Sequence, residues 1–178
     1  MKLKLMILGY ARHGKDTVAE ILRDAWGLKM VSSSHAAGQK IMLPYFESIG
    51  IKYKDFEECY QDRVNHRQEW FEQIKAYNTP DKARLAREIY SDSDIYVGIR
   101  AIEEFEAVKA EGLFNYSIWV DRSKHIAPES AASNTITKEM ADYVIDNNGT
   151  LEDLKTRTRA LYIDLISLEY AGQYLQEK

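Results

Sequence analysis

Cysteine, proline and long apolar runs are all scarce in this chain of 178 residues. The single cysteine, Cys59, excludes a disulfide within the chain, which is typical of proteins from a reducing cytoplasm. With three prolines and no stretch rich in glycine and serine, the sequence shows no interdomain linker. No apolar run is long enough to cross a bilayer, so we expect neither a membrane span nor a membrane partner.

The first apolar stretch is also short. It begins after residue 4, ends at Gly9 and meets Arg12 and Lys15, with no small-residue cleavage site. We therefore expect a cytoplasmic protein without a signal peptide. The net charge of −4 argues against a protein that coats nucleic acid, although a local basic groove stays compatible with it. An apolar content of 45% predicts one folded domain over residues 1–178.

Short apolar runs alternate with helical patterns along the chain. This alternation predicts a parallel sheet covered on both faces, and right-handed crossovers favour a doubly wound, three-layer α/β sandwich with five strands. A polar helical insert is expected at about residues 36–90, and an unusually long loop at about 122–138. We expect strands at residues 3–8, 28–31, 94–99, 116–121 and 143–145, and helices at 15–26, around 102–108 and from 151 onward. Serines at positions 32–34 are expected to cap a helix.

The most informative motif lies between the first strand and the first helix. Residues 9–17 read Gly-Tyr-Ala-Arg-His-Gly-Lys-Asp-Thr and fit G-x-x-x-x-G-K, the pattern of a phosphate-binding loop. Gly9 and Gly14 let successive backbone N–H groups turn inward around an anion, and the following helix adds its partial positive charge. Lys15 then reaches the outer phosphate oxygens. The expected nucleotide-binding residues here are Gly9, Ala11, His13, Gly14, Lys15, Asp16 and Thr17.

Asp16 departs from the usual motif, in which Ser or Thr directly follows the lysine. A hydroxyl one position later, here Thr17, is similar to the arrangement in nucleoside monophosphate kinases. Asp16 either coordinates Mg²⁺, holds one of its waters, or acts only as a favourable acid in the first helical turn. Asp16 and Thr17 are the expected metal residues, and Asp16 joins Lys15 among the expected catalytic residues.

Three segments together resemble phage deoxynucleoside monophosphate kinases. They are the Gly-x-x-Arg-x-Gly-Lys-Asp-Thr loop, Arg100 at the end of the third strand, and residues 145–152, Ile-Asp-Asn-Asn-Gly-Thr-Leu-Glu. Phosphomevalonate and dephospho-coenzyme A kinases resemble the chain more distantly. The match spans both ends of the chain, whereas the insert aligns poorly. The resemblance implies the P-loop kinase fold, with an acceptor-binding insert and a short lid at about 122–138.

The same resemblance implies an activity and its ligands. ATP is the expected donor, Mg²⁺ the expected metal, and a deoxynucleoside monophosphate or another small phosphate compound the expected acceptor. Asn148 and Gly149 line the adenine by this resemblance; the alternative is a plain turn before a helix capped by Thr150. A phage-encoded protein of this kind works in the host cytoplasm, and a homodimer is left open.

The third strand ends in Gly98-Ile99-Arg100, where such kinases often carry Asp-x-Arg. The arginine is kept and the acid is lost, so Asp16, Asp121 or Asp146 must replace it, or the acceptor differs. Arg100 is expected to grip the acceptor phosphate because ligands bind beyond the carboxyl ends of parallel strands. The alternative is a surface pair with Glu103 or Glu104.

Other basic residues have two readings each. Arg12 lies inside the loop and either neutralises charge during transfer, as a catalytic residue, or points outward towards the lid. Arg63 and Arg67 are expected on one helix face beside Trp70, either holding a phosphate and stacking a base or forming a solvated face. Arg122 opens the expected lid and is taken as a substrate-binding residue. Two further arginines, Arg84 and Arg87, favour a surface role.

The motifs predict an ATP-dependent kinase, with three alternatives. The first is a P-loop kinase that phosphorylates a hydroxymethylated pyrimidine within phage DNA, for which Asp16 or Asp121 serves as the base. The second is a nucleotide-binding ATPase or switch module without kinase activity. The third is a kinase for a small metabolite such as a coenzyme precursor.

Overall fold

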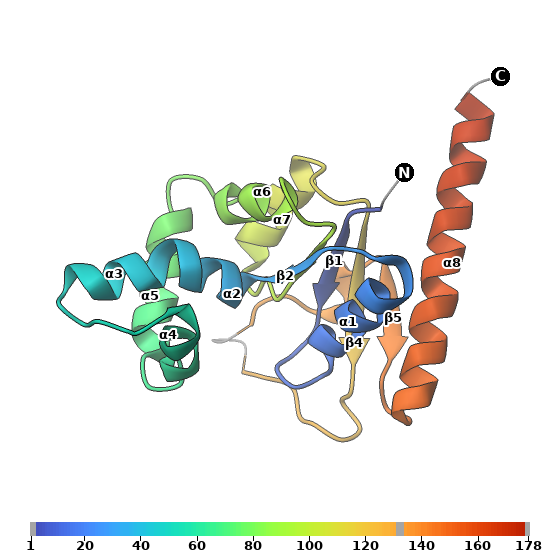
Figure 1. Ribbon diagram of the computed structural model, residues 1–178. Coiled ribbons are helices and arrows are strands. Elements are labelled where there is room, and N and C mark those ends of the chain that lie inside the picture. Colours follow the sequence, from blue (N-terminus) through green and yellow to red (C-terminus); the bar gives the residue numbers. More distant parts are fainter. Residues whose placement is uncertain (1–2, 131–133, 177–178) are drawn as a thin grey trace.

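Five short strands form a parallel sheet at the centre of the molecule (Figure 1). The computed structural model describes residues 3–130 and 134–176. In order across the sheet, the strands are β2 (Met30–Ser32), β3 (Ile95–Val97), β1 (Leu5–Leu8), β4 (Tyr116–Asp121) and β5 (Tyr143–Asp146). The predicted α/β class and parallel sheet are confirmed. The strand after residue 28 begins later than expected, and the third strand ends earlier because the chain turns at Gly98.

Successive side chains of β1 pack alternately into two separate hydrophobic cores, one on each face of the sheet. Leu5 and Ile7 pack with Ile95, Val120 and other apolar residues on one face. The intervening Met6 and Leu8 pack on the other face, in a cluster that includes tyrosine and tryptophan side chains of β3 and β4. Because all four residues of β1 are buried, this strand is apolar throughout, as expected for the centre of a parallel sheet.

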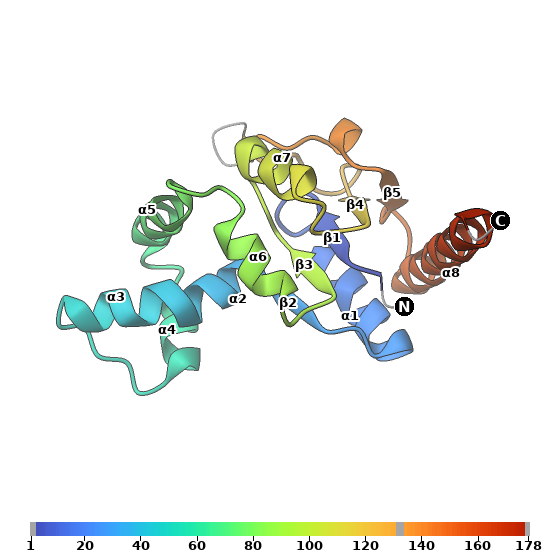
Figure 2. The ribbon, with the colours of Figure 1, turned by 90° about the horizontal axis from the view of Figure 1, so that it is seen from above.

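Helices α1 (Lys15–Trp26) and α8 (Leu151–Gln176) cover one face of the sheet. Figure 2 shows α6 (Arg84–Tyr90) and α7 (Ile102–Ala110) on the opposite side. Thr150 caps α8 as predicted: its Oγ1 accepts from the Asp153 N–H, and its own N–H donates to the Asp153 carboxylate. Within the part of the chain that the structure describes, none of the helices has the length and apolar character needed to span a bilayer.

The insert leaves the sheet after β2 and returns before β3. It comprises α2 (Ser33–Ala37), a π-helix at Gly38–Met42, α3 (Leu43–Ser48), α4 (Phe56–Asp62), α5 (Arg67–Asn78) and α6. Ser32 caps α2 by accepting from the His35 N–H, as the serine run predicts. Figure 1 shows α2–α5 extending from the β2 edge, opposite to α8. A short 3₁₀ helix, Lys138–Met140, precedes β5.

Candidate functional site

The segment between β1 and α1 is curled, as a phosphate-binding loop requires. Gly9 and Gly14 have φ angles of 139° and 94°, values that favour glycine. A Cβ on Gly9 would lie 2.7 Å from the Val120 carbonyl oxygen, and one on Gly14 would lie 2.5 Å from the Asn147 amide nitrogen. Residues 9–15, here called the phosphate loop, therefore lie tightly against the ends of β4 and β5. Arg12 has a φ of 63° and an exposed side chain, as its outward-pointing reading requires.

Lys15 opens α1 and folds back over the loop. Its ammonium donates to the Tyr10 carbonyl oxygen at 2.7 Å. Burial lowers the pKa of Lys15 to about 8, with a further contribution from the positive charge of Arg100. Asp16 and Glu129 oppose this shift. Two cations from different strand ends therefore converge beside the loop, as binding of a multiply charged anion requires.

The ring of His13 is fully buried and holds the loop after β4 in place. Its Nδ1 accepts from the Arg122 N–H at 3.0 Å, so the proton lies on Nε2, which donates to the Ile126 carbonyl oxygen at 3.1 Å. Both ring nitrogens of His13 thus bond to backbone groups of the protein itself. A contact between His13 and a nucleotide would therefore involve its backbone and not its ring.

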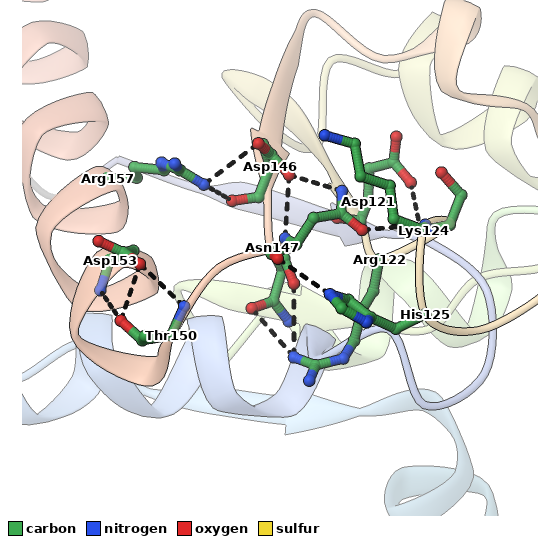
Figure 3. Close-up of polar contacts among 11 residues, drawn as sticks. Asp121, Arg122, Lys124, His125, Asp146, Asn147, Thr150, Asp153 and Arg157 are labelled. Carbon is green, nitrogen blue, oxygen red and sulfur yellow. Dashed lines mark hydrogen bonds and ion pairs between the residues drawn. The ribbon is translucent and has the colours of Figure 1, made fainter.

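Polar contacts join the segment after β5 to the segment after β4 (Figure 3). The Asn147 side chain is 3% exposed and donates to the His13 carbonyl oxygen at 2.8 Å. Asn148 accepts from the Lys124 N–H at 3.0 Å and donates to the Asp146 carboxylate. The Asn-Asn-Gly segment is therefore more than a plain turn. Asn147, which the nucleotide-binding prediction omitted, contacts the phosphate loop directly through His13. Its neighbour Asn148 connects the ends of β4 and β5.

Arg122 lies on this side of the loop. Its guanidinium Nη1 is 3.4 Å from both the backbone and the side-chain oxygen of Asn147. The predicted acceptor residues follow β2 and β3, on the other side of β1. The structure thus places Arg122 after β4, beside Asn147, and apart from the other predicted acceptor residues. Residues 131–133 of the expected lid lie outside the described residues.

Arg100 follows β3, and it contacts a residue that the sequence did not single out. Its Nη1 donates to one oxygen of the Glu129 carboxylate at 2.7 Å. The other oxygen accepts from the Ala11 N–H, in the phosphate loop, at 2.6 Å. Glu103 and Glu104, the alternative partners, contact Lys82 and Asn78. Glu129 carried no sequence signal, since it lies in a loop without periodicity.

The basic residues of the insert are arranged differently from the prediction. Arg63 and Arg67 do not share a helix face, because Asn65 bonds back to Asp62 and ends α4 before α5 begins. Arg67 is exposed. Trp70 is 4% exposed and packs in the core near Gly38, so it does not offer a free face for a base.

Arg63 instead belongs to a small cluster beside β2. Its Nη1 donates to the Ser34 hydroxyl at 3.0 Å, and its guanidinium lies 4.3 Å from the centre of the Tyr60 ring. The Tyr60 hydroxyl is 3.1 Å from the same serine oxygen, and the ring of His35 stands edge-on to Tyr60. Ser34 and Tyr60 are polar groups at the carboxyl end of β2 that the sequence did not indicate. Arg84 and Arg87 contact Tyr77, Asp81, Glu88 and Glu111 at the surface.

The carboxylates considered as replacements for the missing acid have different surroundings. Asp121 accepts from the Ser123 N–H and lies 3.9 Å from Lys138. Asp146 bonds Asn148 and pairs with Arg157. Asp16 is exposed in the first turn of α1, next to the half-buried Thr17. Among the described residues no group of three acidic, histidine or cysteine side chains could hold a metal alone.

An open depression on the outer side of α4 is strongly acidic. It is lined by Tyr53, Asp55, Glu57, Glu58, Gln61, Asp62 and Asn65. Its four carboxylates repel phosphate groups, so this depression is not a phosphate site. The same charge opposes contact between this face of the insert and a DNA backbone.

Comparison with known proteins identifies the fold. No protein-family model and no curated protein sequence matches the chain. TT1252 from Thermus thermophilus is a solved structure with 19% identity and a TM-score of 0.52, over 92% of this chain and 98% of that one. A gluconokinase from Sinorhizobium meliloti 1021 has 14% identity and a TM-score of 0.52, over 96% and 97% of the two chains. A shikimate kinase from Acinetobacter baumannii, in complex with shikimate, has 14% identity and a TM-score of 0.50, over 94% and 95%. The chain thus has the fold of P-loop kinases.

Proposed function

We propose that the protein is a phosphotransferase that moves the γ-phosphoryl group of ATP to a deoxynucleoside monophosphate. One observation carries this proposal. Lys15, Arg100 and the Ala11 N–H all lie near the Glu129 carboxylate, at one place on the sheet edge. That point lies where ligands bind in parallel α/β sheets. Positive charge from the loop and from the neighbouring strand end suits a transferring phosphoryl group with an acceptor phosphate beside it.

The chemistry needs positioning and charge neutralisation more than a nucleophile. The phosphate loop would hold the donor phosphates through its N–H groups, with Lys15 on the outer oxygens. The loop N–H groups and Lys15 would neutralise charge as the phosphoryl group moves, and Arg100 would hold the acceptor phosphate beside it. A phosphate acceptor is already ionised near neutral pH, so no strong general base is needed.

ATP and Mg²⁺ fit the residues present. Gly9 and Gly14 let the loop curl against the ends of β4 and β5, where a Cβ would meet backbone or amide atoms, and a loop curled in this way would turn its N–H groups toward phosphate. Asp16 and Thr17 lie at the start of α1 and would hold Mg²⁺ together with phosphate oxygens and water, an arrangement that this ion prefers. The metal would neutralise phosphate charge when bound. Asn148, Gly149 and Arg122 would face the adenine side.

The acceptor would lie on the β2–β3 side. Arg100 would hold its phosphate, and Arg63 with Tyr60 and Ser34 would contact the rest of the nucleotide. A guanidinium against an aromatic ring, flanked by hydroxyl groups, suits a polar planar base better than a purely aliphatic substrate. This cluster therefore favours a nucleotide acceptor.

A screen of acceptors with labelled ATP tests the proposal. It should include deoxynucleoside monophosphates, small phosphorylated metabolites and duplex DNA with hydroxymethylated pyrimidines. Lys15→Ala should abolish transfer to every acceptor, and Arg100→Ala should mainly raise the acceptor KM. Arg159→Ala, which removes an exposed arginine on α8, is the control and should leave the kinetics unchanged. Hydrolysis of ATP without transfer to any acceptor would instead support the ATPase module.

A further inference from the structure

Both oxygens of the Glu129 carboxylate are bound at the phosphate loop. One accepts from the Ala11 N–H at 2.6 Å, and the other accepts from Arg100 at 2.7 Å. The side chain is only 19% exposed. Although burial opposes ionisation, the hydrogen bonds from Arg100 and Ala11 outweigh it, and the pKa of Glu129 is lowered. A carboxylate anion therefore sits on the donors of the loop in the ligand-free protein.

The backbone on either side of Glu129 holds it there. Before it, His13 fixes the Ile126 carbonyl oxygen. After it, the Thr135 N–H donates to the Arg100 carbonyl oxygen at 3.0 Å, and the Ile102 N–H donates to the Thr135 hydroxyl at 2.8 Å. Ile126 is thus held at the phosphate loop, and Thr135 is held at the end of β3. Glu129 contacts both places, through Ala11 and Arg100.

The donors that hold Glu129 are the ones that the proposed function needs for phosphate. Ala11 supplies a loop N–H, Arg100 supplies a guanidinium, and Lys15 is close enough for its charge to interact with Glu129. A carboxylate and a phosphate group cannot share these donors without strong repulsion between their charges. One anion must leave before the other can bind.

We propose that Glu129 occupies the phosphate site of the ligand-free protein and that the phosphates of a nucleotide must displace it. This inference rests on the proposed function only in that the loop binds nucleotide phosphates. Glu129 then sets the affinity, because the apparent Kd equals the intrinsic Kd divided by the fraction of molecules in which the site is open. Glu129 thus acts as an internal competitor of the nucleotide phosphates.

Calorimetry with MgATP and MgADP on wild type and Glu129→Gln tests the inference. The variant loses the charge and keeps the size, so both nucleotides should bind about 10- to 150-fold more tightly, the range of one charge-assisted hydrogen bond. Glu139→Gln is the matched control: it removes an exposed glutamate from the 3₁₀ helix before β5 and should bind as wild type does. Equal or weaker binding by Glu129→Gln would overturn the inference alone. Failure of wild type and both variants to bind any nucleotide would overturn the proposed function as well.

A second measurement follows the carboxylate directly. In NMR spectra of ligand-free protein, the Ala11 amide should shift in Glu129→Gln and not in Glu139→Gln. Saturating MgADP should release the Glu129 carboxylate of wild type, which the chemical shift of its side-chain carbon reports. A carboxylate that keeps its ligand-free shift under saturating nucleotide would contradict displacement.

Discussion

At the scale of single residues, the charge of Lys15 is the feature most sensitive to conditions. The ammonium is half-buried, and Arg100 lies close enough to repel it. Both effects disfavour the charged form of the ligand-free protein. A bound phosphate would reverse this balance, because it supplies the negative charge that Lys15 lacks.

This balance predicts how nucleotide affinity depends on pH. Lys15 is protonated below its pKa of about 8, and only the protonated form clasps phosphate. As the pH rises above 8, the protonated fraction of the ligand-free protein falls, so the association constant for MgADP should fall about tenfold per unit until the pKa of the bound state is reached. Calorimetry between pH 7 and 10 measures this slope. Lys15→Ala should bind weakly with no such slope, and an unchanged wild-type affinity across the range would contradict the prediction.

The sequence identified some site residues and missed others for a physical reason. Lys15 and Arg100 were predictable because a motif and a strand end fix where their backbones lie. Glu129 was not, since only tertiary contacts of a long loop bring it to Ala11. For His13, a position inside the motif does not reveal that the side chain turns into the protein.

At the scale of elements, the packing of α4 and α5 against the π-helix of the insert depends on the absence of a side chain at Gly38. A Cβ built there would lie 2.7 Å from ring carbons of both Phe56 and Trp70. The glycine therefore lets α4 and α5 approach the first helices of the insert closely. This approach also fixes Tyr60, on α4, beside Ser34.

Gly38→Ala should therefore destabilise the protein. The gain in helix propensity of up to about 1 kcal/mol is outweighed by overpacking, which costs about 1–3 kcal/mol. We expect the free energy of unfolding to fall by about 1–2 kcal/mol in urea titrations. Gly172→Ala is the control: it makes the same change in α8, where nothing lies within 4 Å of the added Cβ, and it should leave stability unchanged or raised. Equal stabilities for the two variants would contradict the packing argument.

Element boundaries were predictable where local signals are strong. The helix at 15–26 and the strand at 116–121 have the expected bounds, because glycine borders the helix on both sides and the strand is buried. Within the insert, spacing suggested one face for Arg63 and Arg67. A turn made by Asn65 and Asp62 separates them, and spacing alone does not reveal such side-chain bonds.

At the scale of the whole molecule, the site is assembled from segments far apart in the sequence. The phosphate loop, the end of β3 and the end of β5 meet only because the sheet places β1 between β3 and β4. Alternation of strands and helices predicted this type of sheet, but not which face of the insert turns toward the loop. That arrangement depends on packing of the insert helices, which the sequence pattern leaves open.

Because the site joins both halves of the chain, a bound nucleotide should stabilise the entire fold. At a free concentration of 100 times its Kd, MgADP stabilises the folded state by about 2.7 kcal/mol. For a chain of this size the melting temperature should rise by roughly 5–10 °C. Thermal unfolding with and without MgADP measures this shift, and Lys15→Ala should show little of it. If saturating MgADP leaves the melting temperature of the wild type unchanged, the assignment of the loop as a nucleotide-binding site is contradicted.

The strand order has one more consequence. In the proposed function the adenine would lie beyond β4 and the acceptor beyond β3, and the sheet places β1, which leads into the phosphate loop, between these two strands. Two substrates entering from opposite flanks meet the reacting phosphorus from opposite directions, so entering and departing oxygens lie in line. A γ-phosphorus made chiral with oxygen isotopes should accordingly emerge with its handedness inverted after one turnover, whereas a covalent phosphoenzyme would restore the original hand.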